Sequence, residues 1–187
     1  SPDEYQKYCH SSEGAGCSLG TPWGDSYIVL NPYGLNEDVI SHEMCHDELF
    51  ARLGWWKTTT QIPQWFNEGL ALMLDRRFVP ETDSLQRYLS YRDEWMYLTH
   101  GAQEVLELQN LKSMRGFFGG NQRHVMLAYM TAGMEVSYWL ALTGSNQVQV
   151  LLDAIRQGAD FSETYRSMKK AGEKRLGLPP SRHPLQW

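Results

Sequence analysis

The stretch NEDVISHEMCHDELFARLG, residues 36–54, has the pattern of a single amphipathic helix. Asn36 can cap its first turn, and Gly54 suits the position just after its last turn. Residues that recur every three or four positions share one face of such a helix; they are Val39, His42, His46, Leu49 and Leu53. Two of the six histidines in the chain therefore lie on the same side of one predicted helix.

The segment HEMCH, residues 42–46, predicts a metal site on this helix. Residues i and i+4 are one turn apart, so the imidazoles of His42 and His46 can face one metal ion. Glu43 is rotated from His42 by about 100°, which makes it a poor third ligand but lets it reach a water molecule on the metal. This H-E-x-x-H arrangement is typical of zinc metallopeptidases. The alternative is a pair of surface histidines beside an acid.

Glu68 is the candidate third ligand. It lies in the next predicted helix, PQWFNEGLALMLDRRF, residues 63–78. The chain between His46 and Glu68 is long enough to end the first helix, turn, and bring the second helix back antiparallel. Two histidines and one glutamate leave the fourth tetrahedral position for water, as in catalytic zinc sites, whereas structural sites are more often closed by four protein ligands.

The succession of HEMCH, residues 42–46, and PQWFNEGLA, residues 63–71, resembles the gluzincin zinc metallopeptidases, the thermolysin-like or peptidase-MA-like group. The likeness extends upstream to YIVLNP and weakly downstream to the C-terminal segments, so it covers most of residues 26–166. It implies a zincin-like fold, a bound Zn²⁺ ion and a peptide or protein substrate. It also implies roles for four residues: His42, His46 and Glu68 as zinc ligands, and Glu43 as the general base.

The same resemblance implies how a substrate would be held. The strand Ser26–Asn31 would be the sheet edge to which a peptide adds, so the substrate-binding residues would be Tyr27, Ile28, Val29, Leu30 and Asn31. Family members usually supply a Tyr or a His that stabilises the oxyanion, and Tyr129 in LAYMTAG has the matching place, with His124 as the alternative. From the residues alone, Tyr129 could equally belong to the core, and His124 to the surface.

One position departs from the thermolysin pattern. Thermolysin has an acid four residues after its glutamate ligand, which orients a ligand histidine, and Leu72 stands at that position here. The partner of His42 must therefore come from elsewhere. Asp38, one turn before His42, is a geometric candidate, although it could equally be an acid at a helix start.

The rest of the chain predicts one α+β domain over residues 1–187. Residues 1–34 form an irregular or β part, with residues 1–24 irregular and an edge strand near 26–31, where SYIVLN is rich in β-branched residues. Active-site helices occupy about 36–78 and a helical C-terminal part about 81–172. Within that part we expect a loop at 116–121, helices over 122–142 and 146–157, and a third helix that begins after Asp160. The tail 176–187 is rich in proline and should be extended.

The composition of the chain limits the classes of partner and the cellular compartment that are expected. The net charge is −5 and no basic block occurs, so no nucleic-acid partner is expected. Apolar runs are short and interrupted, so no transmembrane segment is expected; the oligomeric state stays open. Cys9 and Cys17 flank a glycine-rich loop and could form a disulfide, or stay reduced, with Cys45 left buried in a helix. A disulfide, and a first residue other than Met, would favour a secreted or periplasmic protein.

The sequence therefore predicts zinc-dependent hydrolysis of peptide bonds. One alternative is a zinc-binding module that has lost catalysis and binds a protein or peptide partner. The presence of Glu43 argues against it, because a module that only binds a partner does not need that carboxylate. Another alternative is a helical interaction domain without a metal.

Overall fold

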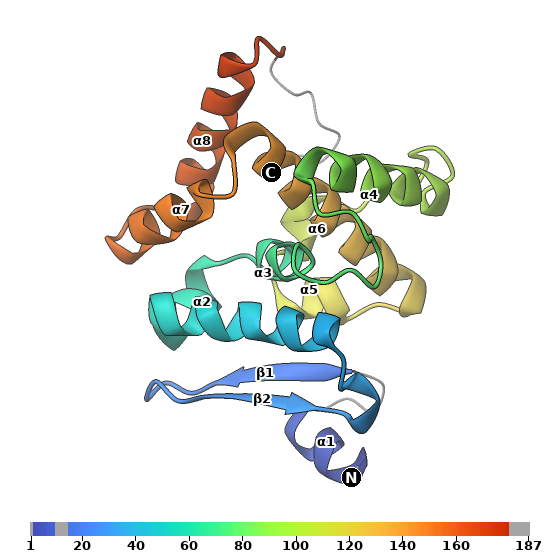
Figure 1. The fold of residues 1–187 in the computed structure, drawn as a ribbon, viewed down its shortest axis with the longest axis vertical. Helices are drawn as coiled ribbons and strands as arrows, with labels where there is room; N and C mark the ends of the chain where they lie inside the picture. The colour runs from blue at the N-terminus through green and yellow to red at the C-terminus, as the bar shows by residue number, and fades with distance from the viewer. Residues whose placement is uncertain (1, 10–14, 180–187) are drawn as a thin grey trace.

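The computed structural model describes residues 2–9 and 15–179. Its small sheet and helical majority confirm the predicted α+β class. Figure 1 shows the hairpin at one end, with α2 lying along it and the other long helices on the far side of α2. The elements in chain order are α1 (Pro2–Cys9), β1 (Gly16–Gly20), β2 (Ser26–Leu30), the 3-10 helix η1 (Pro32–Gly34), α2 (Glu37–Gln61), α3 (Gln64–Ala71), α4 (Ser84–Leu98), the 3-10 helix η2 (Leu108–Leu111), α5 (Met114–Phe118), α6 (Gln122–Thr143), α7 (Gln147–Arg156) and α8 (Phe161–Arg175).

The N-terminal hairpin corrects one prediction. The strand expected near 26–31 is β2, but residues 1–24 are not all irregular, because they contain α1 and β1. The β1 sequence GCSLG lacks β-branched residues, so its strand conformation comes from antiparallel pairing with β2, from Gly16↔Leu30 to Gly20↔Ser26. A disulfide between Cys9 and Cys17 joins α1 to β1, which is one of the two states that the sequence left open.

Helix α2, which carries both predicted histidine ligands, begins and bends where the sequence indicated. The side chain of Asn36 accepts a hydrogen bond from the Val39 amide at 3.0 Å. Gly54 has φ +77° and interrupts the helical backbone, a conformation that glycine adopts without strain. The chain then resumes as a helix to Gln61, so the predicted end is a kink between two helical segments.

Helix α3, which carries Glu68, is shorter than predicted. It ends at Ala71 instead of residue 78, and a turn follows in which the Met73 and Leu74 amides bond to Leu70 and Ala71 carbonyls at 3.0 Å. An irregular segment, residues 72–83, then leads to α4. The loop expected at 116–121 is also shortened, because α5 extends to Phe118.

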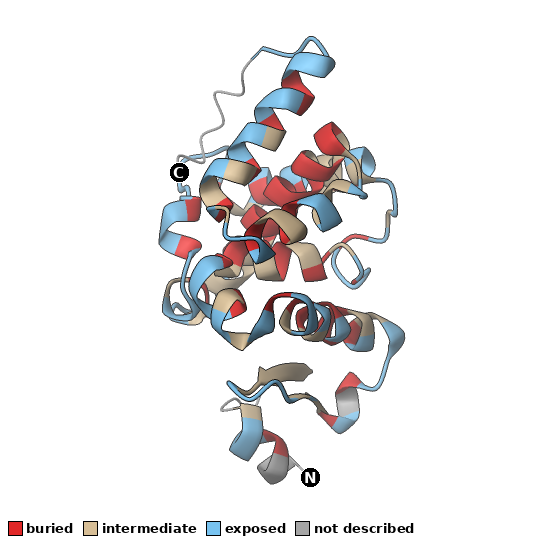
Figure 2. Cartoon of the chain, turned by 90° about the vertical axis from the view of Figure 1, so that its left-hand side faces the viewer, coloured by how far each residue is buried: buried red, intermediate tan, exposed pale blue. Residues whose placement is uncertain are grey.

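The core surrounds α6, and Figure 2 shows buried residues concentrated on the helices in the middle of the molecule. The predicted helix over 122–142 is α6, and the predicted helices over 146–157 and after Asp160 are α7 and α8. The side chain of Asp160 caps α8 by accepting from the Glu163 amide at 2.8 Å. An aromatic cluster joins α3, α6 and α8; it comprises Trp65, Phe66, Trp139, Phe161 and Tyr165. The extended tail predicted for 176–187 lies mostly outside the described residues.

α6 is long and apolar enough, by length and composition alone, to cross a membrane. However, 72% of its apolar window is buried inside the protein, and the core helix of a soluble protein passes the same test. The absence of a transmembrane segment therefore stays a prediction.

A buried ion pair ties α6 to α8 and provides a test of the fold. Lys169 Nζ donates to both carboxylate oxygens of Glu135 at 2.7 and 3.0 Å, and both side chains are almost fully buried. Lys169→Ala would leave the Glu135 charge without this partner, so we expect the free energy of unfolding to fall by about 3–5 kcal/mol. The neighbouring exposed Lys170 is the matched control, and Lys170→Ala should change the free energy of unfolding little. Urea denaturation of both variants measures the difference; equal midpoints would contradict the prediction.

Candidate metal centre

Two helices bring the three predicted ligands together. His42 and His46 lie one turn apart on α2, and Glu68 lies on α3. All three residues are buried, and one ligand atom from each lies within 4.8 Å of the other two. Within residues 2–9 and 15–179, this is the one group of three or more His, Cys, Asp or Glu side chains placed to hold a metal ion.

The orientation of these side chains suits a metal ion. Nε2 of His42 lies 3.3 Å from Glu68 Oε2, and Nε2 of His46 lies 3.7 Å from Glu68 Oε1. Gln64 Nε2 donates to Glu68 Oε1 at 2.8 Å, whereas the buried Oε2 faces His42 Nε2 without the alignment of a hydrogen bond. A buried carboxylate oxygen that accepts no hydrogen bond is costly unless something binds it. Two imidazole nitrogens and this oxygen therefore form a donor set that could hold a metal ion.

The other nitrogen of each imidazole faces a polar partner that the sequence analysis did not identify. His46 Nδ1 lies 2.8 Å from Asn67 Oδ1, and His42 Nδ1 lies 3.3 Å from Asp75 Oδ2, without the alignment of a hydrogen bond. Such partners fix ring orientation and leave Nε2 for the metal. Asn67 could have been suggested as a partner of His46 because it is the neighbour of Glu68 in the sequence. Asp75 could not, because its position depends on where α3 ends.

Asp38 is not the partner of His42. Its carboxylate accepts from the backbone amide of Arg76 at 3.1 Å and pairs with the Arg76 guanidinium at 3.5 Å. Of the two roles left open for Asp38, the one beside His42 is wrong, because the chain after α3 returns to place Asp75 against His42 and Arg76 against Asp38. Asp38 is instead an acid in the first turn of α2. Elsewhere on α2, Glu48 pairs with Arg52 at 2.6 Å.

His42 lies between two carboxylates, which determines its charge in the metal-free protein. Burial opposes a charge on His42, but Asp75 and Glu68 raise its pKa to about 9 from an ordinary 6.5. Burial would likewise raise the pKa values of Asp75 and Glu68, but His42 and Arg77 lower that of Asp75, and His46 and His42 lower that of Glu68. Because the pKa of His42 is raised on folding, its charge stabilises the metal-free protein below about pH 6.5, and this contribution is lost as pH rises through about 9.

Glu43 is buried beside the three ligands without belonging to their group. Burial raises the pKa of its carboxyl, while the nearby histidines lower it and the charge of Glu68 raises it. Its side chain lies against β1: a Cβ atom added at Gly16 would be 2.8 Å from Glu43 Cγ and 2.9 Å from Oε1. A residue without a side chain therefore lets the strand approach the predicted general base.

The structure separates the two candidates for the oxyanion donor. Tyr129 on α6 lies near the ligands, since burial and then the charges of Glu68 and Glu43 raise the pKa of its hydroxyl well above 10.0. Its ring stacks on Phe78 with centroids 5.8 Å apart. His124, in the first turn of α6, instead places Nε2 2.8 Å from the Gly116 carbonyl. Of the two, Tyr129 has the contacts with site residues.

The predicted substrate-binding residues, Tyr27–Asn31, belong to β2 and the position after it. From Tyr27 to Leu30 they pair with β1 in the N-terminal hairpin. β1, which the sequence analysis missed, is the strand that meets Glu43. The Ser26 hydroxyl donates to Asp47 and so ties β2 to α2. The role of residues 27–31 in substrate binding stays a prediction. Cys45, between the two histidines, is buried as expected, and burial raises its thiol pKa to about 12.

The pKa of His42 predicts how metal affinity depends on pH. A protonated imidazole cannot bind a metal, so the metal must displace the His42 proton at neutral pH. We expect the zinc association constant to rise about tenfold per pH unit between about pH 7 and 8, and to level off near pH 9 instead of near 6.5. Competition with a chelator of known affinity measures this dependence, and Asp75→Asn should move the plateau to lower pH. An affinity that is constant above pH 7 would contradict the prediction.

Comparisons of the chain with protein-family models, with curated proteins and with solved structures find no match. The resemblance to gluzincins therefore rests on HEMCH and WFNEGLA in the sequence itself. Function has to be argued from the chemistry of the site.

Proposed function

We propose that this protein is a zinc-dependent peptidase in which Glu43 is the general base. One observation carries the proposal: a carboxylate that is not a ligand is buried directly beside a His42–His46–Glu68 donor set. A site that only binds a metal has no use for a further buried acid, because an uncompensated carboxylate destabilises the fold. A hydrolase uses such an acid to accept a proton.

The donor set favours zinc over other ions. Two neutral imidazoles and one carboxylate suit Zn²⁺, while Mg²⁺ and Ca²⁺ prefer oxygen ligands alone. His42, His46 and Glu68 would hold the ion, with Asn67 and Asp75 behind the histidines. When bound, zinc would lower the pKa of a water molecule to about 7 and polarise the carbonyl of the scissile bond.

Glu43 moves the protons of the reaction. Its carboxylate accepts a proton from the attacking water and passes it to the amine that leaves when the peptide bond breaks. The raised pKa of Glu43 suits this exchange, because a more basic carboxylate takes a proton from water more readily. β1 packs against the side chain at Gly16 and so limits the positions that the carboxylate can take.

Tyr129 supports the negative charge that develops on the carbonyl oxygen. Its hydroxyl keeps its proton at any physiological pH because burial and the nearby acids raise its pKa. It can therefore donate a hydrogen bond to an oxyanion throughout the reaction. The contacts of its ring with Phe78 and Phe117 hold that ring in place.

The Cys9–Cys17 disulfide supports a secreted or periplasmic location for this activity. The bond links the end of α1 to β1 of the hairpin, and such a disulfide is compatible with an extracellular protein. Disulfides persist in oxidising compartments and are rare in the cytosol. A peptidase in such a compartment would meet peptides or proteins outside the cytoplasm as substrates.

Glu43→Gln separates catalysis from metal binding. The amide keeps the size of the side chain but cannot accept the proton, so we expect turnover of a peptide library to fall by at least about 10²-fold. Zinc content should stay at about one ion per chain. Glu48→Gln is the matched control on the same helix, because Glu48 is exposed and pairs only with Arg52 among the contacts described; it should leave turnover unchanged.

The outcomes of this experiment distinguish the alternatives. Full turnover by Glu43→Gln with normal zinc content would overturn the peptidase proposal and favour a zinc-binding module. A native chain that contains no zinc after purification without chelators, and takes up none, would favour a helical interaction domain.

Tyr129→Phe tests the oxyanion donor. The ring contacts remain, so the variant should fold and keep its zinc, while turnover falls by about 10-fold to 10³-fold through loss of one donor. KM should change less than kcat, because the hydrogen bond forms mainly in the transition state. His124→Gln, which alters the other candidate, should have little effect on kcat. The reverse result would reassign the role to His124.

A further inference from the structure

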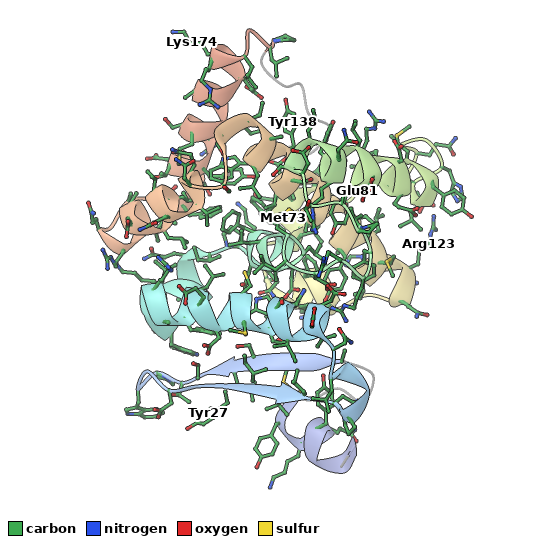
Figure 3. The ribbon with its side chains drawn as sticks, viewed as in Figure 1. Tyr27, Met73, Glu81, Arg123, Tyr138 and Lys174 are labelled. Atoms are coloured by element: carbon green, nitrogen blue, oxygen red, sulfur yellow. A yellow bond between two sulfur atoms is a disulfide. The ribbon has the colours of Figure 1, made fainter. Side chains whose placement is uncertain are left out.

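The segment that supports the metal centre has no regular secondary structure of its own. Residues 72–83 connect α3 to α4, and their side chains reach the site at two points: Asp75 lies against His42, and Phe78 stacks on Tyr129. Figure 3 marks Met73 and Glu81, near the two ends of this segment. Something other than a helix or a sheet must hold its backbone in position.

Arg87, in the first turns of α4, supplies that support. It is 2% exposed, and its guanidinium donates to three backbone carbonyls of the segment. Nη1 donates to Leu72 at 2.5 Å and more weakly to Asp75 at 3.4 Å, and Nε donates to Glu81. One buried side chain thus contacts the beginning, the middle and the end of the connection.

The chemistry of arginine explains why it occupies this position. Buried carbonyl groups must find donors, and this segment has no neighbouring strand or helical turn to provide them. A planar guanidinium presents five donors in a fixed fork, whereas a lysine presents one compact ammonium group. The backbone of α4 that carries Arg87 is itself fixed at its start, because Asp83 caps the helix by accepting hydrogen bonds from the Leu85 and Gln86 amides at 3.0 Å.

The contacts of Arg87 lead to the metal ligands by two short routes. Leu72 is the C-cap residue of α3, and its amide bonds to the carbonyl of Glu68, the third ligand, at 2.9 Å. Asp75 turns its backbone carbonyl to Arg87 and its carboxylate to His42. The guanidinium therefore holds the backbone of a residue whose side chain orients a ligand.

We propose that Arg87 is a positioning residue of the metal centre, which acts on His42 through Asp75 and contacts neither metal nor substrate. The inference rests on the metal site of the proposed function, and it adds a residue outside that site. Neither the H-E-x-x-H pattern nor the helix that carries Glu68 indicates a role for an arginine in α4.

Arg87→Lys tests the proposal by metal affinity, with no reference to turnover. Lysine keeps the charge and most of the chain, but its single nitrogen cannot take the places of both Nε and Nη1. The zinc Kd should therefore rise by about 10-fold to 100-fold, the usual effect of losing a partner of a ligand histidine. Arg92→Lys is the matched control, because Arg92 lies on the same helix and is exposed in a pair with Asp93. A zinc Kd within about twofold of the native value, in folded Arg87→Lys, overturns the proposal.

A double-mutant cycle shows whether the effect passes through Asp75. In the Asp75→Asn background, Arg87→Lys should change the zinc Kd by less than about threefold, because the interaction through which it acts has been removed. Fully additive losses would show that Arg87 does not act through Asp75 and would overturn that route. Visible absorption of the cobalt-substituted protein gives a second readout, because its bands respond to ligand geometry; Arg87→Lys should change them and Arg92→Lys should not.

Arg87→Ala with added guanidinium guards against a failure to fold. The ion can fill the space of the missing side chain, so guanidinium at millimolar concentration should restore both helix content and zinc affinity. Restored helix content without restored zinc affinity would limit Arg87 to a structural role and overturn the proposal. Failure of the proposed function is seen elsewhere: in a native chain that binds no zinc, or in a fully active Glu43→Gln variant.

Discussion

The close approach of α3 to α6 is the constraint on which the site depends. A Cβ atom at Gly69 would lie 2.6 Å from Val136 Cγ2 and 2.7 Å from the Ala132 carbonyl oxygen, so only glycine fits there without movement of α6. Gly69 directly follows Glu68, which means that this contact sets the depth of the carboxylate in the protein. The aromatic cluster around Trp65 and Phe66 fixes the rotation of α3 about its axis. Together these contacts aim Glu68 at the two histidines of α2.

The electrostatics of the centre follow from this packing. His42 has a carboxylate on each side, Glu68 toward the candidate metal position and Asp75 behind the ring. In the metal-free protein these acids favour a proton on the imidazole, and a divalent cation would replace that proton while it also bound the Glu68 oxygen that faces the ring. The two carboxylates thus stabilise the charged imidazole when no metal is bound, and they hold Nε2 of His42 where a metal ion could bind it. Arg77 donates to both oxygens of Asp75 and so balances its charge.

The sequence was informative where the geometry is local. His42, Glu43 and His46 could be placed because helix periodicity alone relates them, and the Asn36 cap and the Gly54 break follow from backbone chemistry. Glu68 needed the further assumption of a helix that returns, and Tyr129 came only from the family resemblance. Asp75 could not be found, since its place depends on the early end of α3 and on the path of an irregular segment. β1 was missed because GCSLG has no strand pattern, and an arginine in the first turns of a helix is usually exposed, so Arg87 gave no signal.

Gly16 shows that a position can be constrained by a neighbouring side chain in whose proposed chemistry it takes no part. Any other residue there would place its first carbon atom within 3 Å of the Glu43 side chain, and the group that would have to move is the carboxylate itself. The neighbouring Cys17 is held by the disulfide, and the Gly16 carbonyl accepts a hydrogen bond from the Tyr5 hydroxyl at 3.0 Å, so the strand has little freedom to retreat. Among descendants of this gene in which Glu43 keeps its role, codon 16 should tolerate substitution as poorly as the codons for Glu43, His42 and His46. This should hold although Gly16 has no side chain.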